Sequence, residues 1–181
     1  MLDFLKNTLA RAWLGCALLL IATLSVAGES GGRYQIGTPA TSAEVAKWNI
    51  SVYSTGRNLP AGSGTVLAGE KIYANQCQSC HGESGKGGLG DALVGGVGSL
   101  ASAKPLRTVG SFWPNAPTIF DYIRRAMPMS APLSLTNDEV YAVTGYVLYL
   151  NKLLERDTIV DAQVLANIQM PNREGFVLDD R

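Results

Sequence analysis

The chain has 181 residues, a formal net charge of zero and a hydrophobic content of 46%. This length favours one compact domain with extensions over two full domains. The balanced charge excludes both the strongly basic field of a nucleic-acid-binding protein and the acidic run of a disordered tail, so we expect no nucleic-acid partner.

The first 27 residues form a segment of their own. A weakly basic start precedes an apolar run from 12 to 27, and Ser25 and Ala27 are small residues at the positions that a signal peptidase reads. We therefore predict a secretory signal peptide over residues 1–27 and export to an oxidising compartment. A retained membrane anchor is the alternative, although sixteen helical residues rise only about 24 Å, less than the roughly 30 Å hydrocarbon core.

The next segment, residues 28–62, is polar and interrupted by Pro and Gly, and we predict an irregular arm. A first helix follows over about 65–77, with Ser63 as a possible cap and apolar residues at 66, 69, 72 and 73. Gly69 and Tyr73 lie on one side of this helix, so a second helix can cross closely at the glycine, with Tyr146 or Tyr149 beside Tyr73.

Residues 77–81 read C-Q-S-C-H. A structural zinc site needs a second pair of ligands, and after the signal peptide Cys77, Cys80 and His81 are the remaining cysteines and histidines. A redox-active C-x-x-C usually opens a helix after a strand, whereas helical residues precede this one. The C-x-x-C-H spacing is typical of covalent haem c attachment, with thioethers from Cys77 and Cys80 and His81 as an axial iron ligand. The sequence therefore predicts one haem c.

Two more helices follow the motif. The second is predicted over about 117–126 and ends at a Met-Pro pair. The third begins with T-N-D-E at 136–139, a capping box with Thr136 and Glu139, and continues to about 154 with apolar residues at 140, 143, 147, 150 and 154. Residues 155–181 form a C-terminal tail.

The loop between these two helices offers a second axial ligand. His81 is the only histidine, and methionine is the usual partner of histidine in electron-carrying cytochromes. Pro128 ends the helix and favours extended backbone at Met127, which frees the thioether to leave the helix surface. We therefore predict Met127 as the second iron ligand. Met129 in the same loop, Met170 in the tail and an open sixth position remain alternatives.

Four other side chains lie near this loop in sequence. Arg124 and Arg125 are candidates for pairing with haem propionates, and they are equally compatible with a solvated helix face. Tyr122 belongs to the same helix. We expect Trp113 in the core.

The order of these features resembles the class I cytochromes c from residue 63 to 154. The C-x-x-C-H follows the first helix, and a methionine loop precedes the last. The resemblance implies an all-α haem domain over 63–154, flanked by the arm 28–62 and the tail 155–181, which pack around it or against a partner. In this family a proline carbonyl from the following loop, here the glycine-rich 82–98, accepts a hydrogen bond from the proximal histidine. The resemblance places Ala92 at that position.

Longer strings extend the resemblance over residues 37–176. Among them are P-A-T-S-A-E-V-A-K-W (39–48), S-F-W-P-N-A-P-T-I-F-D-Y-I-R-R-A-M-P (111–128) and M-P-N-R-E-G-F (170–176). They resemble the cytochrome subunits of bacterial sulfane and sulfite dehydrogenases. Larger members of that group carry a second haem domain, whereas this chain has one C-x-x-C-H.

The resemblance implies a role in sulfur oxidation. The chain would accept electrons in the periplasm from a molybdenum-cofactor subunit that oxidises a reduced sulfur compound, and pass them to a downstream cytochrome c. It would not itself be the catalytic subunit. Two alternatives remain: a haem enzyme with an exchangeable sixth ligand, of the thiosulfate-oxidising or peroxidase type, and a free periplasmic electron shuttle.

Overall fold

The computed structural model describes residues 37–177, so the predicted signal peptide lies outside the described residues. The chain divides into two units, residues 1–46 and 47–181. The helix α2 (Ser42–Trp48) spans the boundary between them and has no buried residue. Within residues 37–177, no helix is long and apolar enough to cross a membrane.

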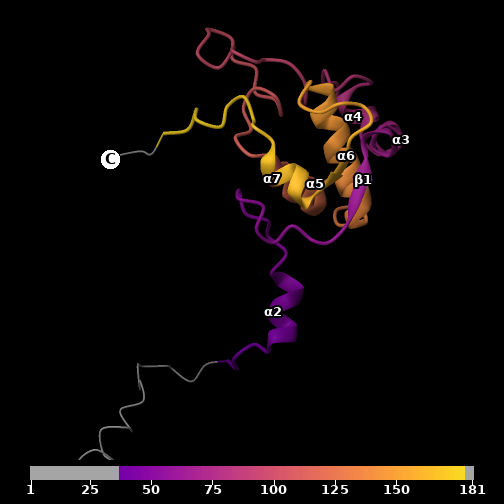
Figure 1. The fold of residues 1–181 in the computed structure, drawn as a ribbon, viewed down its shortest axis with the longest axis vertical. Helices are drawn as coiled ribbons and strands as arrows, with labels where there is room; N and C mark the ends of the chain where they lie inside the picture. Colours follow the sequence, from indigo (N-terminus) through magenta and orange to yellow (C-terminus); the bar gives the residue numbers. More distant parts are fainter. Residues whose placement is uncertain (1–36, 178–181) are drawn as a thin grey trace, which may run out of the picture. The chain divides into compact units, whose positions relative to one another are not determined.

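The second unit contains the three predicted helices. Its elements in chain order are β1 (Ser63–Thr65), α3 (Val66–Gln76), α4 (Gln78–His81), α5 (Ala116–Ala126), α6 (Asn137–Leu150), β2 (Ile159–Asp161) and α7 (Ala162–Asn167) (Figure 1). Helices α3, α5 and α6 correspond to the predictions at 65–77, 117–126 and 136–154. Helix α6 ends earlier than predicted, and Lys152 just beyond it has a φ of +62°, outside the helical region.

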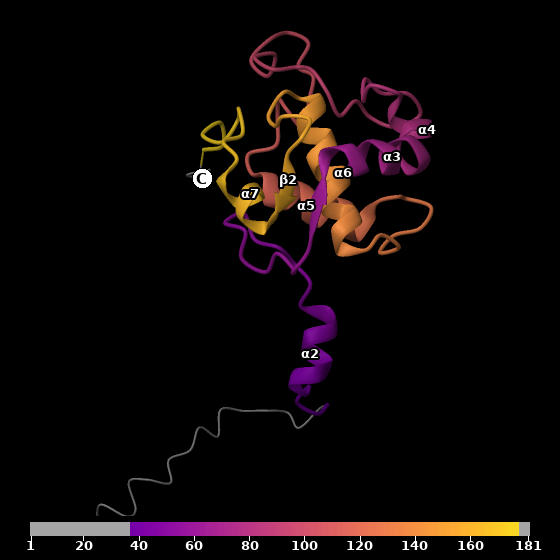
Figure 2. The same cartoon turned by 45° about the vertical axis from the view of Figure 1, so that its right-hand side comes forward.

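Helices α3 and α6 cross at close range (Figure 2). A Cβ atom on Gly69 would overlap the backbone carbonyl of Ala142, so only glycine permits this approach. Tyr146 packs against Tyr73 with 5.3 Å between ring centroids, and Tyr149 stacks on Tyr146 at 6.1 Å. The predicted crossing at Gly69 is confirmed, and Tyr146 is the direct neighbour of Tyr73.

Local side-chain bonds start both of these helices. The capping box predicted at α6 is present, because the Thr136 side chain accepts from the Glu139 N–H and the Glu139 carboxylate accepts from the Thr136 N–H. The prediction of Ser63 as the cap of α3 was wrong. Thr65 takes this role and accepts from the Ala68 N–H, while Ser63 lies in β1.

The tail and the arm contain more regular structure than predicted. Strand β2 pairs antiparallel with β1, and Val160 at its centre is fully buried. Leu165 of α7 and Met170 also belong to the main hydrophobic core. The prediction of irregular extensions missed β2 and the helices α2 and α7, because a three-residue strand and helices of about two turns are too short for a periodic pattern.

Residues 49–62, which we call the strap, lie against α5 and α6. Val52 is buried, and its N–H donates to the carboxylate of Asp121 on α5 at 2.9 Å. The Tyr141 hydroxyl of α6 donates to the carbonyl of Pro60 at 2.7 Å. Two elements of the haem domain therefore hold the strap by buried or half-buried hydrogen bonds.

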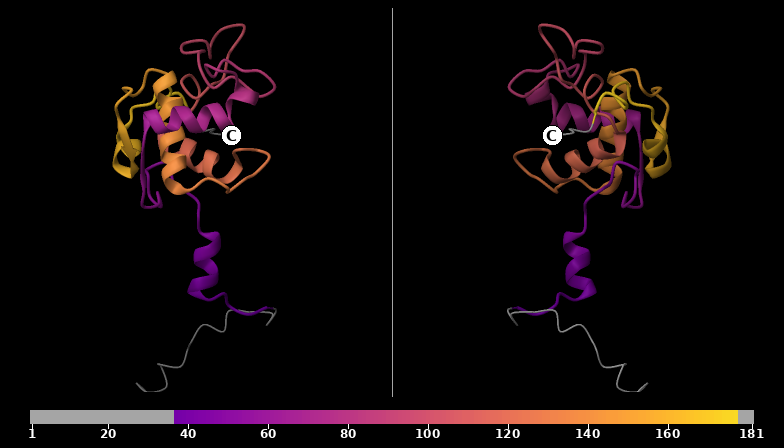
Figure 3. Two further views of the ribbon diagram at one scale, coloured as in Figure 1. Left: turned by 90° about the vertical axis from the view of Figure 1, so that its right-hand side faces the viewer. Right: turned by 90° about the vertical axis from the view of Figure 1, so that its left-hand side faces the viewer.

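Helix α5 is a short amphipathic helix with one buried face. Its buried residues are Ala116, Pro117, Ile119, Phe120 and Asp121, and it ends where Met127 adopts extended backbone (φ −123°, ψ 144°), as Pro128 predicts. The strands and α7 lie on one side of α6, and the loop 127–135 lies on the other (Figure 3). We call residues 127–135 the Met127 loop.

Candidate haem site

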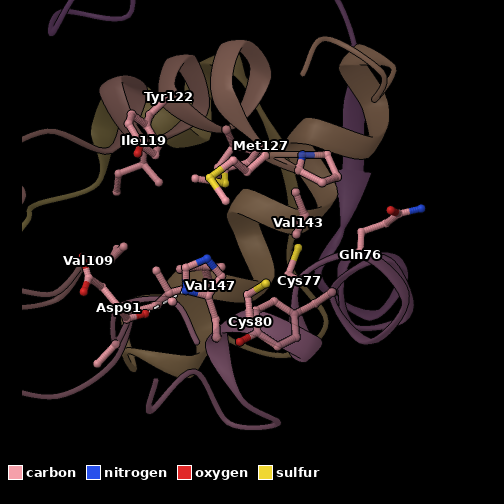
Figure 4. A pocket seen from close by; sticks show the side chains of 18 of the residues that line it. Gln76, Cys77, Cys80, Asp91, Val109, Ile119, Tyr122, Met127, Val143 and Val147 are labelled. Atoms are coloured by element: carbon pink, nitrogen blue, oxygen red, sulfur yellow. Dashed lines mark hydrogen bonds between the residues drawn. The ribbon is translucent and has the colours of Figure 1, made fainter. Parts of the chain in front are cut away.

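A cavity of about 630 Å³ lies among α3, α4, α5, α6 and the Met127 loop. This volume is in the range of small-molecule and cofactor sites. Cys77, Cys80, His81 and Met127 all line it. Figure 4 shows the sulfur atoms of the two cysteines and of Met127 turned toward the same space. The structure thus brings the four predicted site residues to one cavity.

Two consecutive helices position the C-x-x-C-H motif. Cys77 ends α3 by donating its N–H to the carbonyl of Tyr73, and the N–H of His81 donates to the carbonyl of Cys77 at 2.9 Å, which closes the turn of α4. Gly82 follows with a φ of +77° and ends the turn. Burial raises the pKa of Tyr73 to about 12, so its hydroxyl stays protonated and donates to the Gly82 carbonyl at 2.8 Å.

The two cysteines of the motif differ in exposure. Cys77 is half-buried, and burial raises its pKa to about 11. Cys80 is exposed. A half-buried thiol beside an exposed one is compatible with attachment of a group that lies partly in the cavity and partly at its mouth.

The imidazole of His81 is fixed by a backbone carbonyl. Its Nδ1 lies 2.7 Å from the carbonyl oxygen of Asp91 (Figure 4, dashed line). A carbonyl can only accept, so Nδ1 donates and Nε2 is the ring nitrogen left to bind a metal ion. The expectation that Ala92 provides this carbonyl was wrong by one residue. The N–H of Gly90 donates to the carbonyl of Cys80 at 2.8 Å, and this loop closure places residue 91 at the ring.

The glycine-rich segment runs close to this ring. A Cβ atom on Gly90 would lie 3.1 Å from Cε1 and 3.2 Å from Nδ1 of His81, and one on Gly88 would lie 2.8 Å from the Cys80 carbonyl oxygen. These distances are tighter than ordinary van der Waals contact. The glycines therefore let the loop backbone pack directly on the C-x-x-C-H turn.

The three candidate methionines have different environments. Met127 lines the cavity and is half-buried, with its N–H bonded to the Ile123 carbonyl at the end of α5. Met129 also lines the cavity, but 80% of its surface is exposed. Met170 is buried in the core away from the cavity lining. The geometry favours Met127 over both alternatives.

Two comparisons with known proteins found similarities. The family model described as "Cytochrome C oxidase, cbb3-type, subunit III" matches residues 64–147. A chain in the crystal structure of the sulfane dehydrogenase SoxCD from Paracoccus pantotrophus is 37% identical, with a TM-score of 0.78 over 82% of this chain and 74% of that chain. No curated protein sequence matches. The chain belongs to the class I cytochrome c family.

As a class I cytochrome c, the protein has an electron-transfer role and a covalently bound haem c. The cavity fits this group on two grounds. Its walls are mainly apolar, with Ile119 from α5 and Val143 and Val147 from α6, which suits a porphyrin face. Its lining also includes the thiols of Cys77 and Cys80, the imidazole of His81 and the thioether of Met127, which provide the atoms that haem c attachment and iron ligation require.

The predicted arginines do not reach the cavity. Arg125 pairs with Asp121 on the same helix, and Arg124 donates to the carbonyl of Ile50 in the strap at 3.4 Å. Arg107 is the arginine that lines the cavity. Sequence reasoning missed Arg107 because it lies in a stretch without helical or strand periodicity, and no motif surrounds it.

Trp113 lies at the cavity rather than deep in the core. It is half-buried, lines the cavity and packs edge-on against Tyr122, with 5.7 Å between ring centroids. The two aromatic rings therefore form part of the cavity wall beside α5.

Proposed function

We propose that this cytochrome is the electron-accepting subunit of a periplasmic molybdenum-dependent dehydrogenase that oxidises a reduced sulfur compound. The similarity to a chain of the sulfane dehydrogenase SoxCD supports this proposal, because it extends well beyond the haem domain. Residues 1–27 would direct export as a cleaved signal peptide.

Within this proposal the chain holds one haem. Cys77 and Cys80 would hold the porphyrin through thioether bonds, and His81 and Met127 would hold its iron. When bound, the haem would supply one-electron chemistry. The protein's contribution would be to keep the side chains of His81 and Met127 in place.

The surrounding residues tune that site. The Asp91 carbonyl fixes the tautomer of His81 and strengthens it as a ligand. The apolar walls exclude water and disfavour added positive charge, which favours the reduced state. Arg107 lines the cavity and would pair with the haem carboxylates.

The axial assignment is tested by Met127→Ala, with Met129→Ala as the matched control in the same loop. We expect Met127→Ala to lose the sulfur-to-iron charge-transfer band of the ferric protein, and Met129→Ala to keep it. Retention of the band in Met127→Ala would transfer the ligand role to another methionine. Binding of carbon monoxide by the reduced wild-type protein would instead favour an enzyme with an exchangeable sixth ligand.

The partner assignment is tested in the native host. The tagged cytochrome is purified with its associated subunit, thiosulfate and sulfite are added, and haem reduction is followed by absorbance. We expect one of these sulfur compounds to reduce the haem, and we expect no reduction in material from cells grown with tungstate in place of molybdate. Equal reduction in both preparations would contradict a molybdenum-dependent partner.

A further inference from the structure

Helix α5 lies between the haem cavity and the strap. Three of its side chains line the cavity: Ile119, Tyr122 and Ile123. At about 3.6 residues per turn, positions 121 and 124 fall on the opposite side of the helix. Both positions bond to the strap, since the Asp121 carboxylate accepts the N–H of Val52 and the Arg124 guanidinium donates to the carbonyl of Ile50. The strap therefore covers the outer side of α5, while the inner side forms a wall of the haem site.

Asp121 is the buried part of this contact. Only 7% of its surface is exposed, and its carboxylate accepts the N–H of Val52 at 2.9 Å. Its second oxygen accepts from the guanidinium of Arg125 one turn later. Val52 is itself buried, whereas the bond from Arg124 to the strap is long, at 3.4 Å. A buried polar group that loses its partner costs its full desolvation penalty, so Asp121 is the main attachment of the strap to α5.

Met127 directly follows α5. Its N–H donates to the carbonyl of Ile123 at 3.0 Å, which makes it the C-cap of the helix. The loop beyond it gives little support, because Met129 and Leu133 are 80% and 59% exposed. Side chains that bind a metal ion need to stay within about 0.5 Å of the binding geometry. The placement of α5 therefore decides whether the Met127 thioether stays where it would bind the iron.

The strap has a firm anchor of its own. Its far end is fixed to α6, where the Tyr141 hydroxyl donates to the Pro60 carbonyl at 2.7 Å. Helix α6 is buried at every position from 140 to 148, and the Tyr141 ring packs on Phe120 of α5 with 4.5 Å between ring centroids. The strap thus joins α5 to α6 in addition to their direct packing, and both helices are walls of the cavity.

We propose that Asp121 is a positioning residue for the axial methionine. Through its bond to Val52 it clamps α5 between the strap and the cavity, and so it keeps the thioether of Met127 in place. Asp121 itself does not line the cavity. This inference rests on the proposed axial role of Met127 and adds the residue that maintains it. Without the clamp, the sixth position of the iron would become accessible to added ligands.

The test is a titration of the full-length ferric cytochrome with imidazole, a neutral ligand that competes with Met127. Loss of the sulfur-to-iron charge-transfer band reports the displacement. Asp121→Ala leaves the Val52 N–H without its acceptor, and we expect it to lower the dissociation constant for imidazole about tenfold, the scale of one hydrogen bond to a charged group. Asp121→Asn keeps an amide oxygen for this N–H. It should stay within about twofold of wild type, because the lost ion pair with the half-exposed Arg125 contributes little.

Asp138→Ala is the matched control. Asp138 is also a helix carboxylate that accepts a backbone N–H from an earlier segment, that of Ser63 at 2.9 Å, but it belongs to α6. Urea unfolding, followed by far-UV circular dichroism, measures the stability of both variants. We expect Asp138→Ala to lose stability and to keep the wild-type affinity for imidazole.

Each outcome decides between the two proposals. A wild-type protein without the charge-transfer band would overturn the axial role of Met127 and this inference together. With the band present, an unchanged dissociation constant in Asp121→Ala would overturn the positioning role and leave the proposed function intact. An equal decrease in Asp138→Ala would overturn it as well, because the effect would not be specific to α5. An equal decrease in Asp121→Asn would overturn the route through Val52.

A milder variant covers the case in which Asp121→Ala yields no haem protein. Arg124→Ala removes the weaker bond between α5 and the strap, the one to the Ile50 carbonyl. We expect it to lower the dissociation constant for imidazole about twofold. An unchanged constant in Arg124→Ala would then overturn the clamp.

Discussion

The crossing of α3 and α6 and the Met127 loop both border the haem cavity, but they are fixed to very different degrees. At the crossing, backbone meets backbone at Gly69, and every residue of α6 from 140 to 148 is buried. In the loop, Met129 and Leu133 are mostly exposed, and one backbone hydrogen bond, from Ala131 to Pro128, closes a turn within it. The comparison shows a rigid wall on one side of the cavity and a thinly supported ligand loop on another.

This difference has a physical consequence for the site. Regions with few buried apolar contacts open at low free-energy cost, whereas packed helices open only with global unfolding. The His81 side is additionally fixed by the Asp91 carbonyl and the packed glycine loop. We therefore expect the Met127 side to be the first part of the site to move when the protein is perturbed.

We predict the largest loss of stability for a substitution at the crossing of α3 and α6. Gly69→Val places a branched side chain against the Ala142 carbonyl of α6, where backbone leaves no space. We expect a loss of about 3 kcal/mol or more in the free energy of unfolding, or no soluble haem protein at all. Urea unfolding, followed by haem absorbance, measures the loss in the free energy of unfolding.

A matched substitution tests whether the crossing causes that loss. Ala68→Val adds similar bulk one residue earlier, on the exposed side of α3. We expect it to cost only about 0.5 kcal/mol, the difference in helix propensity. Comparable losses in both variants would show that α3 is generally intolerant and that the close approach at Gly69 is unimportant.

The buried side of α6 also predicts a pH dependence. Burial raises the pKa of Tyr141 from 10.0 to about 12. Between pH 10 and 12 the unfolded chain loses this proton while the folded chain keeps it, so the free energy of unfolding falls as pH rises through that window and is unaffected below it. Tyr141→Phe should remove this contribution to the slope and cost about 1.5 kcal/mol at neutral pH, because the Pro60 carbonyl loses its donor. Parallel pH curves for wild type and variant would contradict this prediction.

The features that the sequence predicted correctly are those that depend on nearby residues. The helices, the Gly69 crossing and the Thr136 capping box follow from periodicity and spacing within a few residues. The C-x-x-C-H motif is equally local, and the proline after Met127 correctly predicted extended backbone at the end of α5. These features depend on short-range rules and are readable without an alignment.

The missed features depend on contacts between distant segments. The pairing of β1 with β2 joins residues that are nearly a hundred positions apart, and neither strand is long enough to alternate visibly. The choice of Asp91 over Ala92 depends on how one glycine loop closes on Cys80, and the entry of Arg107 into the cavity depends on an irregular loop path. No local pattern encodes either placement.

A substitution at the junction of the Met127 loop and α6 should cause an intermediate loss of stability. Thr136 caps α6 where the Met127 loop enters it, and Thr136→Ala removes the acceptor for the Glu139 N–H. We expect a loss of about 1 kcal/mol in the free energy of unfolding. Thr136→Ser keeps the hydroxyl and should remain within about 0.3 kcal/mol of wild type. An equal loss in Thr136→Ser would attribute the effect to the methyl group instead of the cap.

We predict the smallest change in the free energy of unfolding for a substitution within the Met127 loop. Leu133 has a φ of +62°, a left-handed conformation that is unfavourable for a branched side chain, and 59% of its surface is exposed. In Leu133→Gly the relief of this strain and the greater freedom of the unfolded chain oppose each other, so we expect a net change within about 0.5 kcal/mol. Leu133→Ala keeps the strained backbone and loses the side chain, so it should be about 1 kcal/mol less stable than the glycine variant. If alanine equals or exceeds glycine in urea unfolding, the backbone at this position is unstrained, and the loop is better supported than the comparison with the α3–α6 crossing implies.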